Sequence, residues 1–214
     1  MKRGILSIIL YALLITVLLL WGCGGGPGSP GSQGTEDTGV IIDAIVTPTY
    51  LGKDTYSVDV FQQVCQAGPP PVYEDFTDHG AKVTIYTRLI NPNPPIPPGT
   101  LYVEKYTVEF RRSSDSIGSP PIQSDTRYKT IVITPPQSGS DTNTLVYEGL
   151  ILVDLKRKAQ YQTDVLSGMY SSGPPAYINN YTATYTFEGQ NQYGTKFSFK
   201  AQTDFQIGSF DYCS

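Results

Sequence analysis

Proline clusters divide the chain after Val40 into short segments that are typical of β-strands. Proline cannot donate a hydrogen bond to a sheet ladder, so each cluster marks a loop. The segments between the clusters are rich in Val, Ile, Thr, Tyr and Phe, the residues that favour strands. The clusters lie at Pro69–Pro71, between Pro92 and Pro98, at Pro120–Pro121, at Pro135–Pro136 and at Pro174–Pro175. The sequence therefore predicts an all-β domain with many turns.

Two segments show the alternation of side chains that half-buried strands require. Within Lys82–Leu89, every second residue is suited to a core, namely Val83, Ile85, Thr87 and Leu89. Leu101–Arg112 predicts a long strand, with one face formed by Tyr102, Tyr106, Val108 and Phe110. Val103 and Lys105 are expected on the opposite face of that strand.

A hairpin is predicted near the end of the chain. Tyr181–Glu188 alternates apolar and polar residues, a turn follows at Gly189–Gly194, and Phe197–Ile207 repeats the alternation. Tyr181 and Tyr185 are expected on the inward face. Phe197, Phe199, Ala201, Phe205 and Ile207 should face the same core.

Further strands bring the expected number to about eight, and they are Val40–Val46, Tyr56–Cys65, Thr130–Thr134 and Leu145–Leu155. The continuous apolar run of Leu145–Leu155 suits a strand that is covered on both faces or one that crosses between sheets. Two antiparallel sheets packed as an immunoglobulin-like sandwich are the natural arrangement. Lys156–Gly168 is compatible with a short helix or with a strand.

The N-terminus has the pattern of an export signal. Lys2 and Arg3 precede an apolar run from Ile5 to Trp21, and this order is typical of a secretory signal peptide. The run ends in Leu20-Trp21-Gly22-Cys23, which resembles the lipobox of bacterial lipoproteins. That resemblance implies a signal peptide over residues 1–22 and a lipid on Cys23. The alternative is an uncleaved membrane anchor.

A tether is expected over residues 23–39, because this stretch is rich in Gly, Ser and Pro and lacks core-forming side chains beyond Cys23. The folded domain is then expected over residues 40–214. Gly24 follows the cysteine where inner-membrane lipoproteins carry Asp, so the resemblance implies an outer-membrane location in a cell with two membranes. This pattern is compatible with either the periplasmic or the cell-surface face of that membrane.

Two cysteines remain in the expected domain. An exported domain with Cys65 and Cys213 left over favours a disulfide between them. Free thiols are the alternative.

Composition argues against a nucleic-acid-binding protein. Only 16% of the residues are charged and the net charge is −4, which becomes more negative if Lys2 and Arg3 are removed. A protein that binds phosphate backbones through charge needs a basic surface.

The stretch from Leu101 to Tyr212 resembles small uncharacterised bacterial lipoproteins that carry one immunoglobulin-like domain. The resemblance rests on the strands VEKYTVEF and TATYTFEGQNQYGTKFSFKAQTDFQIGSFDY and on the intervening LVDLKRK. It implies a sandwich fold and no particular activity. Asn91-Pro92-Asn93-Pro94 is also similar to the Asn-Pro-Asn of desiccation-related sandwich domains, although turn chemistry alone explains it.

The residues that could carry out chemistry are few. His79 is the sole histidine, and its position between Asp78 and Gly80 suggests an exposed loop. Glu74, Asp75 and Asp78 are weak candidates for a calcium site, which Asp59 could join if the strands pair favourably. Because these catalytic candidates are so few, a non-enzymatic role without a cofactor is expected.

Tyr170 and Tyr177 flank a polar loop and are candidates for exposed contacts. The expected function is therefore a membrane-anchored envelope lipoprotein. Its sandwich would contact another envelope protein or play a structural role in an envelope assembly. A module that binds a small molecule, a glycan or an ion is the alternative.

Overall fold

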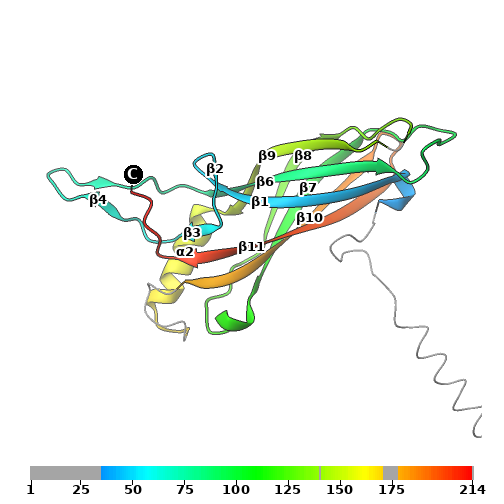
Figure 1. Ribbon diagram of the computed structural model, residues 1–214. Helices are drawn as coiled ribbons and strands as arrows, with labels where there is room; N and C mark the ends of the chain where they lie inside the picture. Colours follow the sequence, from blue (N-terminus) through cyan, green and yellow to red (C-terminus); the bar gives the residue numbers. More distant parts are fainter. Residues whose placement is uncertain (1–34, 140, 171–177, 214) are drawn as a thin grey trace, which may run out of the picture.

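The computed structural model describes residues 35–139, 141–170 and 178–213, and the expected signal peptide, Cys23 and residues 24–34 lie outside this part. Within it, two β-sheets pack face to face as a sandwich (Figure 1). The all-β prediction is confirmed.

One sheet has five strands. In spatial order they are β3 (Ser57–Asp59), β11 (Lys196–Gly208), β10 (Asn179–Asn191), β7 (Leu101–Arg112) and β8 (Asp125–Ile133). The other sheet has four strands. In spatial order they are β2 (Lys53–Asp54), β1 (Val40–Tyr50), β6 (His79–Leu89) and β9 (Asn143–Val153). A separate hairpin is formed by β4 (Val64–Gln66) and β5 (Val72–Tyr73). It projects beyond one end of the sandwich (Figure 1).

The core lies between the two sheets and is dominated by aromatic and β-branched side chains. The predicted β10–β11 hairpin is confirmed, with Tyr181 paired to Phe205 and Tyr185 to Ala201. Every residue expected on its inward face is buried, including Tyr181 and Tyr185, which are 1% and 0% exposed. The tyrosine hydroxyls remain satisfied, since Tyr185 donates to the carbonyl of Ile151 at 3.1 Å.

The segment Tyr56–Cys65 does not form the single strand that was expected. Its first part is β3, which pairs in parallel with β11 at the edge of the five-stranded sheet. Its last part enters β4 in the projecting hairpin. The chain leaves the sandwich between these strands. At this point the side chain of Asp59 accepts the amide of Phe61 at 3.3 Å, which forms a turn in the backbone.

A β-bulge in β7 reverses the predicted faces at the start of that strand, at Tyr102 and Val103. Val103 is fully buried while Tyr102 is 37% exposed, the reverse of the expectation. The pairing shifts between Val103 and Lys105 on the β8 side and between Glu188 and Gly189 on the β10 side. The alternation is therefore broken by one residue, and the predicted inward side is recovered at Tyr106.

Strand β9 lies at the edge of its sheet, where it pairs with β6 alone. The continuous apolar run of Leu145–Leu155 is therefore not a strand covered on both sides. Leu150, Leu152 and Val153 are buried in its second half, whereas Val146 is half-exposed. The pairing shifts near Gly80 and Lys82 adjust which side chains enter the core.

A helix, α2 (Leu155–Leu166), follows β9 and resolves the open choice at Lys156–Gly168. Asp154 caps it, accepting the amide of Arg157 at 2.9 Å. Asp154 also joins Asp125, Arg127 and Arg157 in an ion-pair network with contacts of 2.5–3.2 Å. This network fastens the helix to the edge strand β8.

Two short 3₁₀ helices complete the described elements, η1 (Glu36–Thr38) and η2 (Ser114–Ser116). Thr35 and Thr38 are buried beside β1, so the packed chain begins before Val40, inside the expected tether.

After β6, the side chain of Asn91 accepts the amide of Asn93 at 3.0 Å. The Asn-Pro-Asn stretch is therefore an Asx turn, as turn chemistry predicts.

Replacing Gly189 by Ala should destabilise the sandwich by about 2 kcal/mol or more. A Cβ at this position would overlap the backbone carbonyl of Tyr102 in the neighbouring strand, which cannot move without breaking the bulge. Urea unfolding should show the loss. Gly68→Ala in the projecting hairpin is the matched control, because its Cβ would meet nothing nearer than 3.9 Å. Equal stability of the two variants would contradict this assignment of the bulge.

Candidate functional site

A group of charged side chains lies buried at the end of the sandwich from which the β4–β5 hairpin projects. It consists of Asp59, Glu74, His79 and Lys158, and we call it the buried charge cluster. These four residues are 1%, 5%, 0% and 0% exposed. Ionisable groups are seldom buried to this extent unless they are paired, so the cluster is the most unusual chemical feature of the described chain.

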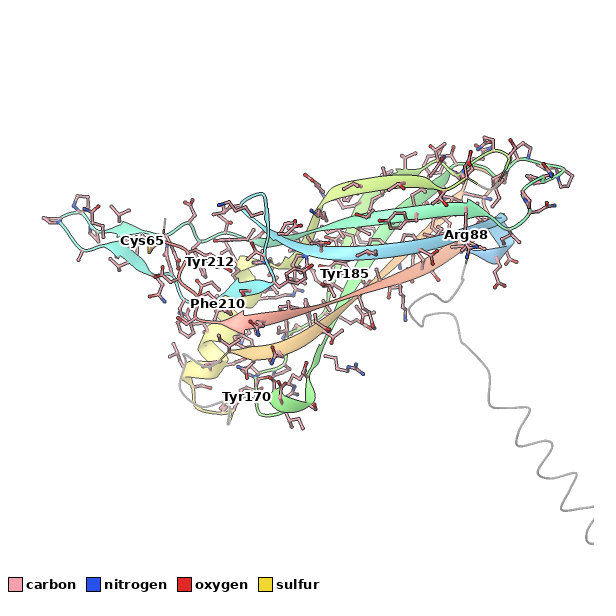
Figure 2. The ribbon with its side chains drawn as sticks, in the orientation of Figure 1. Cys65, Arg88, Tyr170, Tyr185, Phe210 and Tyr212 are labelled. Atoms are coloured by element: carbon pink, nitrogen blue, oxygen red, sulfur yellow. A yellow bond between two sulfur atoms is a disulfide. The ribbon has the colours of Figure 1, made fainter. Side chains whose placement is uncertain are left out.

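Four separate elements bring the cluster together. Asp59 ends β3, Glu74 directly follows β5, His79 begins β6, and Lys158 lies on the inner face of α2. The C-terminal residues 209–213 pass beside the base of the hairpin, where Figure 2 labels Cys65, Phe210 and Tyr212. The site therefore forms only when both ends of the domain are folded.

The two carboxylates bind the backbone of the hairpin and of the C-terminal segment at the same time. Glu74 accepts the amide of Gln63 through Oε1 and the amide of Tyr212 through Oε2, both at 2.7 Å. Asp59 Oδ1 accepts the amides of Phe61 at 3.3 Å and Phe210 at 2.8 Å. Each carboxylate thus joins one residue at the base of the hairpin to one residue of the C-terminal segment.

Aromatic rings surround the amine of Lys158. Its Nζ lies 4.6 Å from the ring centre of Phe76 and 5.1 Å from that of Tyr50. Tyr50 in turn stacks on His79, with ring centres 5.2 Å apart, and contacts Tyr212. Burial lowers the pKa of Lys158 to about 8, although the charges of Asp59, Asp78 and Glu74 oppose this shift.

Burial also disfavours the charged forms of Asp59 and His79. It raises the pKa of Asp59 to about 6 against the opposing hydrogen bonds from Phe210 and Phe61. Glu74 adds to this rise through its negative charge and by offering the protonated form a hydrogen bond. Burial lowers the pKa of His79 to about 4, and the neutral ring donates from Nε2 to the carbonyl of Thr55 at 2.8 Å. The cluster thus contains a buried amine and a buried carboxyl that both tend toward neutrality.

The acidic residues proposed as a calcium site are dispersed. Asp75 is exposed, and Asp78 is exposed while accepting the amide of Leu155 at 2.7 Å. Among the described residues, ligand atoms of Glu74, Asp211 and Cys213 do lie within 4.8 Å of one another. Cys213 is bonded to Cys65, however, and both oxygens of Glu74 already accept backbone amides. These side chains therefore do not offer a free set of cation ligands.

His79 was expected in an exposed loop, and this expectation is wrong. It is fully buried because it begins β6 beneath the ring of Tyr50. Asp59 does approach Glu74, as a favourable strand pairing would allow. Lys158 and Tyr50 were missed. The available signal was the spacing of Lys158, Tyr161 and Val165, which places a lysine on the apolar face of the possible helix.

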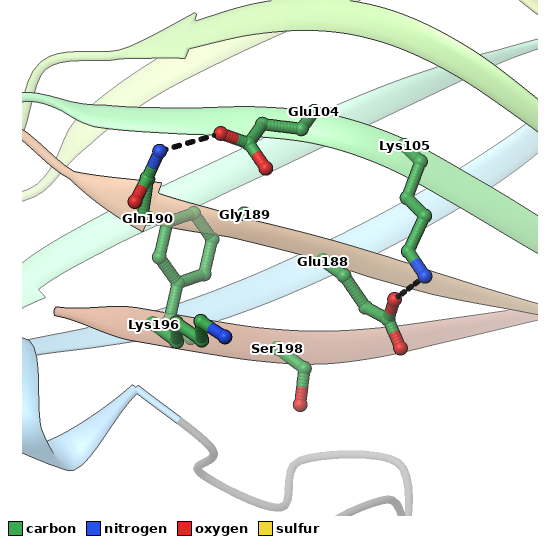
Figure 3. Close-up of a pocket in the computed structure, with 8 residues that line it drawn as sticks. Glu104, Lys105, Glu188, Gly189, Gln190, Lys196 and Ser198 are labelled. Atoms are coloured by element: carbon green, nitrogen blue, oxygen red, sulfur yellow. Dashed lines mark hydrogen bonds and ion pairs between the residues drawn. The ribbon is translucent and has the colours of Figure 1, made fainter. Parts of the chain in front are cut away.

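A second candidate site is a hollow of about 520 Å³ at the β7–β10 bulge (Figure 3). It lies at the opposite end of the sheet from the buried charge cluster. Its polar groups are largely paired with one another, since Lys105 forms an ion pair with Glu188 and Gln190 donates to Glu104 at 2.7 Å. Lys196, Phe197 and Ser198 complete the lining.

The other predicted site residues are the disulfide cysteines, the contact tyrosines and the lipidation site. The disulfide between Cys65 and Cys213 is confirmed, with Cα atoms 5.2 Å apart. Tyr170 is half-buried beyond the end of α2 (Figure 2), and its contact role stays a prediction. Tyr177 and Cys23 lie outside the described residues.

Comparisons with known proteins do not place this chain in a family. No family model matches it, and no curated protein matches it. A solved structure of a putative late embryogenesis abundant protein aligns with a TM-score of 0.32 and 6% identity, covering 81% of this chain and 74% of that one. In the described residues, no helix is long and apolar enough to cross a membrane.

The buried histidine should make stability depend on pH. His79 is protonated near pH 6.5 in the unfolded chain but only near pH 4 in the fold, so the unfolded state binds more protons between these values. Acidification from pH 7 to pH 5 should therefore cost the wild type about 2 kcal/mol more than a His79→Gln variant.

The comparison between the two proteins is needed because Asp59 acts in the opposite direction. Its pKa is raised from 3.8 to about 6, so the fold holds its proton more tightly and gains stability as the pH falls through this range. Urea unfolding of both proteins at each pH isolates the histidine contribution. Parallel stability curves would refute the assignment of His79 as a neutral buried ring.

Proposed function

We propose that this chain is a non-enzymatic lipoprotein of the cell envelope, anchored in the outer membrane through Cys23. Its sandwich is displayed on the tether for contact with another envelope protein or for a structural role in an envelope assembly. The apolar run that ends in Leu20-Trp21-Gly22-Cys23 supports the anchor.

The observation that carries the contact role is the projecting hairpin, residues 64–73, which we call the arm. All of its residues are exposed, and Val64, Val72 and Tyr73 are each exposed by about half, at 50%, 51% and 53%. No charged residue lies between Asp59 and Glu74. Exposed apolar side chains gathered on one element are typical of a protein contact surface.

A disulfide and hydrogen bonds hold the arm to the domain, as expected of an element that contacts a partner. A two-stranded hairpin is only marginally stable by itself in water. Here the disulfide joins Cys65 in β4 to Cys213, and Glu74 binds both Gln63 and Tyr212. Such fastening reduces the ordering cost of binding and so favours affinity.

The placement of the arm suits a protein displayed from an N-terminal anchor. The first described residues lie at one end of the sandwich, and the arm projects from the other (Figure 1). A disulfide also supports an oxidising compartment outside the cytoplasm. Both observations agree with an exported domain that presents its arm away from the membrane.

The limited catalytic inventory supports a non-enzymatic role. His79 is enclosed beneath Tyr50, and the two cysteines of the domain are bonded to each other. An accessible nucleophile with a histidine base therefore cannot be assembled from these side chains.

A second function, the binding of a small molecule, a glycan or an ion, is favoured by the hollow at the bulge (Figure 3). Bulges often re-aim side chains next to binding sites. A saturable thermal shift with candidate ligands, lost in a Lys196→Ala variant, would support this alternative.

Replacing the exposed Tyr73 by Ser should abolish partner recovery by the full-length protein. The protein is crosslinked in its own membranes and captured in mild detergent, and copurifying proteins are quantified. Tyr128→Ser is the matched control, because Tyr128 is 79% exposed on the edge strand β8, away from the arm. Truncating a central aromatic contact commonly weakens an interface by 2 kcal/mol or more, roughly 30-fold in affinity.

The same capture from a Cys23→Ser strain tests the anchor. The variant should leave the membrane fraction or stall in processing, and the partner should be lost with it. Recovery of the same partner by Tyr73→Ser would contradict the arm as the contact element. Unchanged membrane partitioning of Cys23→Ser would contradict lipidation.

A further inference from the structure

Three residues of the buried charge cluster each have one side-chain polar atom without a hydrogen-bond partner. Within the described ranges, four buried side-chain polar atoms have no partner, and three of them are Asp59 Oδ2, His79 Nδ1 and Lys158 Nζ. Native structures leave few such atoms, and each one calls for an explanation. A buried amine and a buried carboxyl group in one enclosed cluster are also the two reactants of an amide bond.

We propose that Lys158 Nζ and Asp59 Cγ join in an intramolecular amide bond, which links helix α2 covalently to strand β3. The two residues lie 99 positions apart in sequence and on different elements of the fold. Once formed, the bond removes the Asp59 carboxyl and the Lys158 amine from titration, so the pKa values given for them describe the unlinked chain. It is independent of the proposed envelope function.

The environment of Lys158 prepares its amine as a nucleophile. Only the unprotonated amine can attack a carboxyl carbon. Lys158 is fully buried against Phe76 and Tyr50, and none of the ion pairs of the described chain includes it. A pKa of about 8 leaves roughly one-tenth of the amine unprotonated at pH 7.

The environment of Asp59 prepares its carboxyl as an electrophile. The amides of Phe61 and Phe210 both donate to Oδ1, where they would stabilise the negative charge that develops during attack. Oδ2 has no partner and is free to leave. A pKa of about 6 leaves roughly one-tenth of the carboxyl protonated at pH 7, the form from which water can depart.

The reaction balances without any co-reactant. The lone pair of Nζ forms a bond to Cγ, and the negative charge develops on Oδ1. The Cγ–Oδ2 bond then breaks, and Oδ2 leaves as water with its own proton and one proton from Nζ. Glu74 lies beside Asp59 and is placed to carry that proton, because its carboxylate can accept a hydrogen bond from the protonated Asp59 carboxyl. Nothing is oxidised or reduced.

The amine must move to react, since it forms no ion pair within 4.0 Å of the carboxylate in this arrangement. Reacting atoms need to approach to about 3 Å. The four-carbon stem of lysine can rotate at its terminal bonds while its helix stays in place. The rings of Tyr50, Phe76 and Tyr212 enclose the cluster and limit the access of water that would favour the charged forms.

Peptide mapping of the full-length protein tests the bond directly. The protein is purified from membranes, reduced, denatured and digested with a protease that cleaves after Lys and Arg. The bond predicts a branched product in which residues 54–82 are joined to residues 158–196, because a modified Lys158 blocks cleavage at that site. Its mass should be lower than the sum of the two peptides by one water molecule.

Three variants assign the atoms. Lys158→Met should release residues 54–82 as a free peptide. Asp59→Asn should still form the bond but lose one ammonia in place of one water. Glu74→Gln, nearly the same shape, should leave most molecules unlinked.

Free peptides 54–82 and 159–196 from the wild type, with cleavage after Lys158, would overturn the proposal. This result needs no variant, so poor folding of a variant cannot obscure it. A branched product joined at any other pair of residues would equally overturn it. A linked Glu74→Gln protein would overturn the part given to Glu74.

Discussion

The two buried carboxylates, Asp59 and Glu74, hold together the end of the molecule on which its proposed contact role depends. Each binds one amide at the base of the arm and one amide of the C-terminal segment, and the Cys65–Cys213 disulfide spans the same two segments. A charge in the interior is costly unless such hydrogen bonds compensate it. The arm therefore keeps its position because buried charge and covalent linkage act at the same place.

The opposite end of the sandwich is organised by backbone geometry. There the bulge at Val103–Lys105 and Gly189 turns two consecutive charged residues of β7, Glu104 and Lys105, away from the core and creates a hollow. The core between the two ends is a continuous set of aromatic and aliphatic side chains. The sandwich thus separates the first described residues from the arm, and this separation fits the proposed contact role.

The sequence predicted the features that follow from regular alternation and missed those that depend on tertiary contacts. The strands around Val83 and Tyr185 and the disulfide were predictable from alternation and from the count of cysteines. Tyr102 was misplaced because one extra residue in a bulge reverses the faces of a strand. His79 and Lys158 were missed as partners, since four distant elements create their site and local polarity suggests exposure.

Amide hydrogen exchange in a Glu74→Ala variant would show whether a buried carboxylate joins the arm to the C-terminal segment. Exchange at Gln63 and at Tyr212 should accelerate together, because both amides donate to the same carboxylate. Exchange at Tyr185 in the core strand β10 should stay slow. Unchanged protection at Gln63 and Tyr212, or acceleration at only one of them, would show that Glu74 does not join the two segments.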